Sequence, residues 1–240
     1  MNLIRTYASL CALALLCFQS STFGDLLVND KSIIDEEWAE LTDWAVQTPP
    51  GATAPSVKAG VLSVSMVGSS TGYYGPSGVR NGAKVPLEYI VTTRVKVSEF
   101  PDIISFDTRD SNTQGVQLVD IRGEDILTVA VTPTGLFIND QVSPGGHNWT
   151  KINLKTDADT FYTWQFQVSE LAGNANEGGT VEIYRRLLDT DPFILVGSSE
   201  IRGTDGADAV YAGRIWYNEE GKSTQGVLVS EYFQLGQAVP

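Results

Sequence analysis

Residues Phe161–Ser169 read FYTWQFQVS, and apolar and polar side chains alternate along this stretch. Tyr162, Trp164 and Phe166 would share one face of an extended chain, because successive side chains of a β-strand point to opposite sides. Threonine and glutamine occupy the positions between them. This period of two predicts a β-strand with one apolar and one polar face.

Strands of similar composition are expected on both sides of this one. The next two lie at Thr180–Leu187 (TVEIYRRL) and Phe193–Ser198. The others are expected at Val61–Met66, Glu88–Val97, Ile103–Asp107, Gly115–Ile121, Ile126–Thr132, Leu136–Asn139, Val210–Tyr217 and Val227–Leu235. Clusters of turn-forming residues separate them, and almost no segment repeats at helical spacing. The sequence therefore predicts an all-β fold.

One segment departs from this pattern. Ile33–Trp44 reads IIDEEWAELTDW, and Ile34, Trp38 and Leu41 would fall roughly on one face of a helix. We expect a turn or a short helix there. The strands, about a dozen in all, exceed the number in an immunoglobulin-type sandwich. We therefore predict a two-sheet antiparallel β-sandwich of the jelly-roll type.

The start of the chain predicts export. Met1–Arg5 is positively charged, and the apolar stretch Leu10–Phe18 follows it, ahead of small and polar residues. This layout is typical of a signal peptide, here residues 1–24 with cleavage after Gly24. The apolar stretch is too short for the roughly 20 residues of a membrane-spanning helix. We expect residues 25–240 to form a single domain that is secreted, periplasmic or on the cell surface, without membrane insertion.

Composition restricts the partners of the exported domain. Both cysteines, Cys11 and Cys17, lie in the predicted signal peptide, so the domain would have no disulfide and would depend on its core for stability. The formal net charge is −13, and the basic residues are scattered along the chain. Nucleic acids and anionic membrane surfaces are unfavourable partners for such a chain. We expect a monomer that binds neither.

The order of these segments carries a family resemblance. LLVND at Leu26–Asp30 leads to the tryptophan-containing segment Trp38–Trp44, then FYTWQFQVS and TVEIYRR follow, and GVLVSEYFQL closes the chain. This layout resembles the concanavalin A-like lectin and glucanase jelly rolls, including the laminin-G-like domains of exported bacterial proteins. The resemblance covers nearly the whole mature chain and implies that the last strand returns beside the first.

The two ends of the mature chain resemble a sorting class. LLVND after a signal peptide and the final residues Gly236–Pro240 (GQAVP) are similar to proteins of the PEP-CTERM class. That class continues with a Pro-Glu-Pro motif, an apolar helix and basic residues, and all three are absent here. Either the chain ends at the start of such a tail or the likeness is accidental.

Few residues fit a catalytic role. The only histidine, His147, stands in the turn-rich stretch PGGHNW and is expected to be exposed in a loop. A single histidine and no mature cysteine exclude ordinary zinc sites and cysteine nucleophiles. Retaining jelly-roll glucanases carry Glu-x-Asp-x-Glu on one strand, which this sequence lacks. The acidic cluster of Asp35, Glu36, Glu37 and Glu40 is expected to be a solvated face.

A polysaccharide lyase is the enzyme class with partial matches. Tyr232–Gly236 (YFQLG) is loosely similar to the Tyr-Phe-Lys-Ala-Gly stretch of alginate-lyase jelly rolls, and Arg94 and Gln117 sit on earlier strands where those enzymes carry Arg and Gln. The resemblance implies Arg94, Gln117 and Tyr232 as the catalytic set. The family's Gln-Ile-His strand is replaced by Val116–Val119 (VQLV), without histidine, and an acidic protein would repel a polyuronate.

Sugar binding without chemistry needs aromatic rings that stack on sugars and polar groups that bond their hydroxyls. The candidate ligand-binding residues on the predicted strands are Trp164, Tyr184, Arg214, Trp216 and Tyr232. The alternative for each ring is that it builds the core of the sandwich.

Calcium is the one cofactor that the resemblance implies. Jelly rolls of this superfamily often hold a structural Ca²⁺ near the first and last strands, and Asp30 and Glu231 have the suitable type and place. The loop residues Asp205 and Asp208 are a second pair. Neither pair has the fixed spacing of a calcium-binding loop.

Three functions are therefore predicted, in order of preference. The first is an exported carbohydrate-binding or surface-adhesion module without catalytic activity, whose partner is a polysaccharide or a cell-surface glycan. The second is a polysaccharide lyase or glycoside hydrolase of jelly-roll fold. The third is a structural protein of the cell envelope or matrix.

Overall fold

The computed structural model describes residues 32–48, 52–65, 77–82, 85–86, 88–100, 115–122, 126–140, 149–170, 178–201, 209–212, 214–216 and 227–237. Within these ranges every regular element is a β-strand, and the strands form two antiparallel sheets. The predicted all-β, two-sheet antiparallel sandwich is thereby confirmed. Among the described residues no helix is long and apolar enough to cross a membrane.

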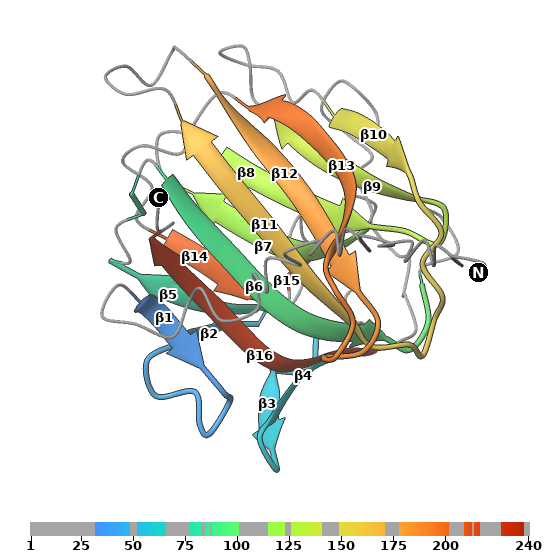
Figure 1. Ribbon diagram of the computed structural model, residues 1–240. Coiled ribbons are helices and arrows are strands. Elements are labelled where there is room, and N and C mark those ends of the chain that lie inside the picture. Colours follow the sequence, from blue (N-terminus) through green and yellow to red (C-terminus); the bar gives the residue numbers. More distant parts are fainter. Residues whose placement is uncertain are drawn as a thin grey trace, which may run out of the picture.

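Sheet A contains the predicted strand Phe161–Ser169. In order across the sheet its strands are β13 (Ile194–Ile201), β12 (Gly179–Arg186), β11 (Tyr162–Glu170), β6 (Glu88–Val97), β16 (Val227–Gln237), β4 (Val61–Ser65) and β3 (Ser56–Lys58). β1 (Ser32–Glu36) also pairs with β16, so the last described strand returns beside the first one. Figure 1 shows β13, β12, β11, β6 and β16 side by side in this order.

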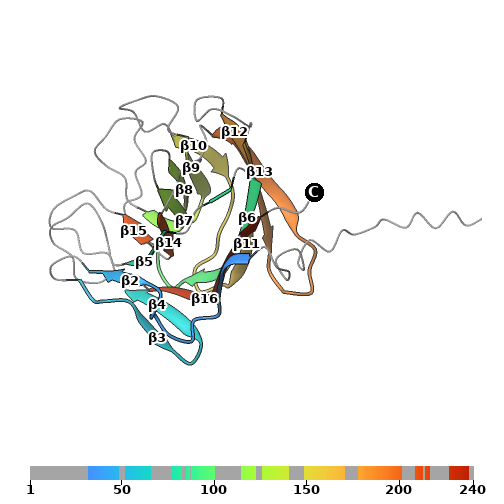
Figure 2. The same ribbon diagram turned by 90° about the vertical axis from the view of Figure 1, so that its left-hand side faces the viewer.

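Sheet B is built from the strands between β6 and β11 in the chain, with additions from both ends. In order its strands are β10 (Trp149–Asn153), β9 (Gly135–Asp140), β8 (Ile126–Val131), β7 (Gly115–Arg122), β14 (Ala209–Ala212), β5 (Ser77–Asn81) and β2 (Ala45–Gln47), and β15 (Arg214–Trp216) also pairs with β7. Seen edge-on in Figure 2, the two sheets form separate layers.

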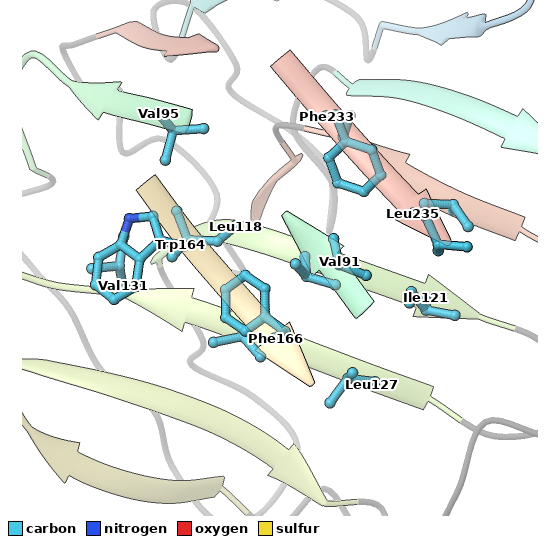
Figure 3. Packing of buried hydrophobic residues seen from close by; sticks show 14 of the residues in the cluster. Val91, Val95, Leu118, Ile121, Leu127, Val131, Trp164, Phe166, Phe233 and Leu235 are labelled. Carbon is cyan, nitrogen blue, oxygen red and sulfur yellow. The ribbon is translucent and has the colours of Figure 1, made fainter. Parts of the chain in front are cut away.

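The core lies between the two sheets. Trp164 and Phe166 of β11 are 1% and 0% exposed, and both belong to one cluster with apolar side chains of sheet B. Figure 3 shows side chains of β6, β11 and β16 gathered with those of β7 and β8. The alternation along β11 is as predicted, and its aromatic face is directed into the sandwich, which was the alternative to ligand binding for Trp164.

The segment Ile33–Trp44 is not a helix. Its start forms β1, and Trp38 and Trp44 are buried beyond it, with ring centroids 5.3 Å apart. The carboxylate of Glu36 accepts hydrogen bonds from the Trp38 backbone N–H at 2.9 Å and the Trp44 indole N–H at 3.1 Å. Trp38 has a φ of 52°, which no α-helix allows. Glu36 therefore fixes a turn and is not part of a solvated acidic face.

Some of the predicted segments lie outside the residues that the structure describes. The predicted signal peptide (residues 1–24) and the predicted strands Leu26–Asp30 and Ile103–Asp107 lie outside the described residues. The single strand expected over Val210–Tyr217 is two strands, β14 and β15, which both pair with β7.

Candidate functional site

Each sheet has a second side, turned away from the other sheet, that carries polar residues. We name these the sheet A face, with Thr92, Arg94, Thr163, Gln165, Tyr184 and Tyr232, and the sheet B face, with Gln117, Asp120, Thr128 and Asn139. The assignment follows from the register, because side chains directly opposite each other on paired strands share one side of a sheet. The core of the molecule separates the two faces.

On the sheet A face, one row of cross-strand partners runs from β16 to β12. Tyr232 is opposite Arg94, Arg94 is opposite Thr163, and Thr163 is opposite Arg186. The neighbouring row joins Gln234, Thr92, Gln165 and Tyr184. Arg94 and Tyr232, two residues predicted for a lyase, therefore do lie side by side.

Two of the three guanidinium nitrogens of Arg94 are bonded to groups of its own protein. Its Nε atom lies 2.7 Å from the Glu231 carboxylate, and its Nη1 atom donates to Thr163 Oγ1 at 3.1 Å and to the Leu187 carbonyl at 3.3 Å. Asp189 lies 3.7 Å away, and the guanidinium stands over the Phe161 ring. The Arg94 side chain is only 14% exposed. To neutralise the carboxylate of a uronate through Nε or Nη1, this guanidinium would first have to give up its bonds within the protein.

The second row of the sheet A face is bonded internally as well. The Gln167 amide donates to Gln165 Oε1 at 3.0 Å, and Gln165 lies within 3.5 Å of the Thr92 hydroxyl. The Tyr184 hydroxyl donates to Glu182 at 2.7 Å. Burial and this carboxylate raise the pKa of Tyr184 to about 12. Tyr184 therefore keeps its proton at neutral pH and is unsuited to act as a base.

The sheet B face is a row of buried polar residues on β7, β8 and β9. Asp120 is opposite Thr128, and Thr128 is opposite Asn139. These three side chains are 0%, 0% and 1% exposed, although they point away from sheet A. Thr128 Oγ1 donates to Asp120 Oδ1 at 2.9 Å. Polar residues of an outer sheet face are normally solvated, so this burial is unusual.

Gln117 is the exceptional residue of the sheet B face. It is opposite Ala130 of β8, it is 1% exposed, and a β-bulge separates it from Val119. Neither Oε1 nor Nε2 of its amide has a hydrogen-bond partner within the described part of the chain. Leaving a buried amide unsatisfied costs about 1–3 kcal/mol, which native proteins rarely tolerate without a functional reason.

β14 and β15 pair with the other edge of β7, and the register places further polar residues opposite Gln117 and Asp120. The backbone of Arg214 in β15 is directly opposite Gln117, and Tyr211 of β14 is opposite Asp120. The side chains of Arg214 and Trp216 lie outside what the structure describes. Gln117 thus stands in the middle of sheet B, between β8 and β15.

The predicted site residues do not form one site. Trp164 is a core residue, 1% exposed. The prediction that it binds ligand is wrong, because the side of β11 that carries Trp164 is turned towards sheet B. Gln117 cannot join Arg94 and Tyr232, since it belongs to sheet B and they belong to sheet A. The predicted lyase set therefore does not come together. Tyr184 and Tyr232 are likewise separated by the core from β15, which carries Arg214 and Trp216.

The predicted calcium ligands receive little support from the described residues. Asp30, Asp205 and Asp208 lie outside them, and the Glu231 carboxylate is bound to Arg94 at 2.7 Å. Glu231 therefore does not fit a calcium ligand. No group of three or more His, Cys, Asp or Glu residues suited to a metal ion occurs among the residues described. Calcium binding stays a prediction.

Sequence reasoning missed Asp120, Thr128 and Asn139 as members of a site. The signal was present in GVQLVDI, where the polar residues Gln117 and Asp120 are three positions apart. Two polar residues on the same side of a strand with this spacing require a β-bulge between them, and the register contains one.

Comparison with known proteins yields similarity of fold. No family model matches the chain, and no curated protein matches it. The endo-β-1,4-glucuronan lyase of the fungus Trichoderma reesei matches with a TM-score of 0.54 at 13% identity, over 85% of this chain and 95% of the lyase. The laminarinase of Flavobacterium sp. UMI-01 matches with a TM-score of 0.52 at 10% identity, over 86% of this chain and 100% of the enzyme.

A protein named for binding shares the architecture too. The binding domain of Paraclostridial Mosquitocidal Protein 1 matches with a TM-score of 0.52 at 10% identity, over 88% of this chain and 50% of that one. This chain has the jelly-roll β-sandwich fold. At such identities the likeness gives the fold alone, and the resemblance to PEP-CTERM proteins has no support in these comparisons.

Proposed function

We propose that this protein is an exported glycan-binding module, that it binds on the sheet B face, and that it does not cleave its ligand. The observation that carries the proposal is the buried, unpartnered amide of Gln117 in the middle of sheet B. A bound ligand would supply the hydrogen bonds that the amide lacks.

The chemistry of the sheet B face suits sugar hydroxyl groups. A glutamine amide both donates and accepts, and a sugar hydroxyl does the same, so one diol can satisfy Oε1 and Nε2 together. Ala130, the residue opposite Gln117, has no polar side-chain atom that could satisfy the amide. Two structural neighbours are named for action on polysaccharides, and this supports a glycan as the ligand.

The described part of the sheet B face favours binding over cleavage. Asp120 is the carboxylate nearest to Gln117 along β7, but it is 0% exposed and accepts a hydrogen bond from Thr128. A ligand that reaches Gln117 meets this carboxylate already bonded to Thr128, and β7 carries no second carboxylate to complete the pair that glycoside hydrolysis needs. The Gln117 amide does not ionise at physiological pH, so it cannot act as a general acid or base.

A glycan and polysaccharide array, run with and without calcium, tests the proposal. Product release is measured in the same wells. Binding without products is the expected result, and loss of binding on chelation would add calcium to the site. An array without any binding would contradict the proposal and favour a structural role in the cell envelope.

A lyase is a second candidate, because one observation favours it. Arg214 is opposite Gln117 in the register and Tyr211 is on the neighbouring strand β14. Lyase chemistry needs a cationic or amide group to neutralise a uronate and a residue such as tyrosine for proton transfer. The net charge of −13 opposes the approach of a polyuronate. Unsaturated products from a uronate polymer in the array would establish this candidate and overturn the first.

A further inference from the structure

Exposed apolar side chains gather at one hairpin. The described residues include five exposed large hydrophobic side chains, and four of them stand at the turn between β12 and β13. Leu187, Leu188, Ile194 and Leu195 are 47%, 56%, 63% and 50% exposed, and we name them the hairpin patch. The fifth is Val46 of β2, at the far end of sheet B. Clustering of this kind marks an interaction surface.

The hairpin patch is held in place by bonds within the turn. The Leu188 N–H donates to Asp191 Oδ2 at 2.9 Å, and the Asp191 N–H donates to the Leu188 carbonyl at 3.0 Å. The Arg186 guanidinium lies over the Phe193 ring, 4.5 Å from its centroid. These contacts hold the turn in a conformation in which Leu187 and Leu188 are exposed.

β13, which carries two residues of the hairpin patch, lies at the edge of sheet A. β13 is the edge strand of sheet A and contacts β9 of sheet B, which fixes it to the sandwich. Ile152 of β10 occupies the space where a side chain at Gly197 would lie. Among the described residues, the outer backbone edge of β13, which continues from the hairpin patch, has no partner strand.

We propose that the hairpin patch binds a second copy of this chain around a twofold axis. Two identical edge strands related by such an axis run antiparallel, and the contact is then self-complementary. Residues 193–199 (FILVGSS) carry no charge in a chain whose net charge is −13. Arg186 and Asp189, 3.5 Å apart, give the rim of the patch both signs of charge. Two acidic copies that meet at this surface therefore bring few like charges close together.

The size of the hairpin patch sets the strength of the contact. Four aliphatic side chains that are about half exposed supply much less than the roughly 800 Å² per partner of a standard stable interface. The dimer is therefore weak and forms in proportion to concentration, in contrast to the monomer expected from the sequence. Salt strengthens it, because ions screen the repulsion between two copies of like net charge.

Sedimentation of the purified protein over micromolar to millimolar concentrations, at low and high salt, tests this proposal. The test variant is Ile194→Lys and the matched control is Val46→Lys. Each substitution removes one exposed apolar side chain and lowers the net negative charge by the same amount, so added repulsion cannot explain weaker association. Thermal unfolding checks that both variants fold.

The wild-type protein should dimerise reversibly, and more strongly at high salt. Ile194→Lys should weaken the dimer about tenfold or more, which corresponds to about 1.4 kcal/mol, and Val46→Lys should leave it unchanged. A wild-type protein that stays monomeric at all concentrations and salts would overturn the proposal. Equal effects of the two variants would overturn it too, since the contact would then lie elsewhere.

Discussion

The central polar side chains of the two outer faces of this sandwich differ in their hydrogen bonding, although the buried Nε atom of Arg186 on the sheet A face also has no partner among the described residues. On the sheet A face Arg94 bonds to Glu231, Thr163 and Leu187, and Gln165 and Gln167 bond to each other. On the sheet B face Gln117 is more deeply buried than Arg94 and yet its amide has no partner among the described residues. A satisfied network stabilises the fold, whereas a buried amide without a protein partner leaves its hydrogen bonds to be supplied by water or by a ligand.

The largest expected effect on stability concerns Trp164, which lies in the core between the two sheets. Trp164→Ala should lower the free energy of unfolding by about 3–5 kcal/mol, because the substitution leaves a large cavity in the core. Chemical denaturation measures this. Tyr232→Ala, a partly exposed ring on the sheet A face, is the control and should lose less than half as much. A Trp164→Ala variant that keeps its stability but loses glycan binding would show that the ring is a ligand platform after all.

The next effect tests the claim that the sheet A face is structural. Arg94→Met should destabilise the protein by about 2 kcal/mol, because it leaves Glu231 without its cation and Thr163 and Leu187 without a donor. Lys96→Met is the control on the same strand and should cost less than about 1 kcal/mol, since its pair with Asp159 is exposed. Binding to the ligand found on the array should be unchanged in both. Loss of binding in Arg94→Met alone, with stability intact, would move the site to the sheet A face.

The smallest effect concerns pH. The raised pKa of Tyr184, about 12 against an ordinary 10.0, means that the folded protein holds this proton more tightly than the unfolded chain does. The resulting stabilisation is fully present below pH 10 and is lost as the pH rises towards 12. Denaturation midpoints of the wild type should therefore fall more steeply over this range than those of Tyr184→Phe, which cannot ionise. Equal slopes would contradict the assigned environment of Tyr184.

The sequence predicts where most strands lie and which side chains share one side of a strand. It does not predict which strands pair with each other. The alternation in FYTWQFQVS correctly separates the polar from the apolar side of β11, because it depends only on the local period of a strand. The same period cannot tell that Arg94 and Gln117 belong to different sheets, since strand pairing is decided by contacts far apart in the chain. Which of the two sides enters the core was also open for Trp164 until β11 was placed against sheet B.

Of the turn and the short helix predicted for Ile33–Trp44, the structure contains the turn, which follows β1, and local contacts explain this outcome. The spacing of Ile34, Trp38 and Leu41 fits a helix, but β1 pairs with β16 and Glu36 bonds to both tryptophans. Tertiary contacts thus outweigh a short helical pattern. In sheet B, the β-bulge after Gln117 likewise departs from the simple period of two. The bulge turns Asp120 to the same side of β7 as Gln117.

The central claim is tested most directly by Gln117→Leu, in a measurement of stability and glycan affinity on the same samples. Leucine has a similar volume and no polar atoms, so the variant should unfold at equal or higher denaturant, by up to about 1–2 kcal/mol. It should bind the glycan at least about tenfold more weakly, the loss of about 1.4 kcal/mol. Gln167→Leu on the sheet A face is the control and should bind like the wild type. Unchanged affinity in Gln117→Leu would contradict the account, since the amide would then have no part in recognition.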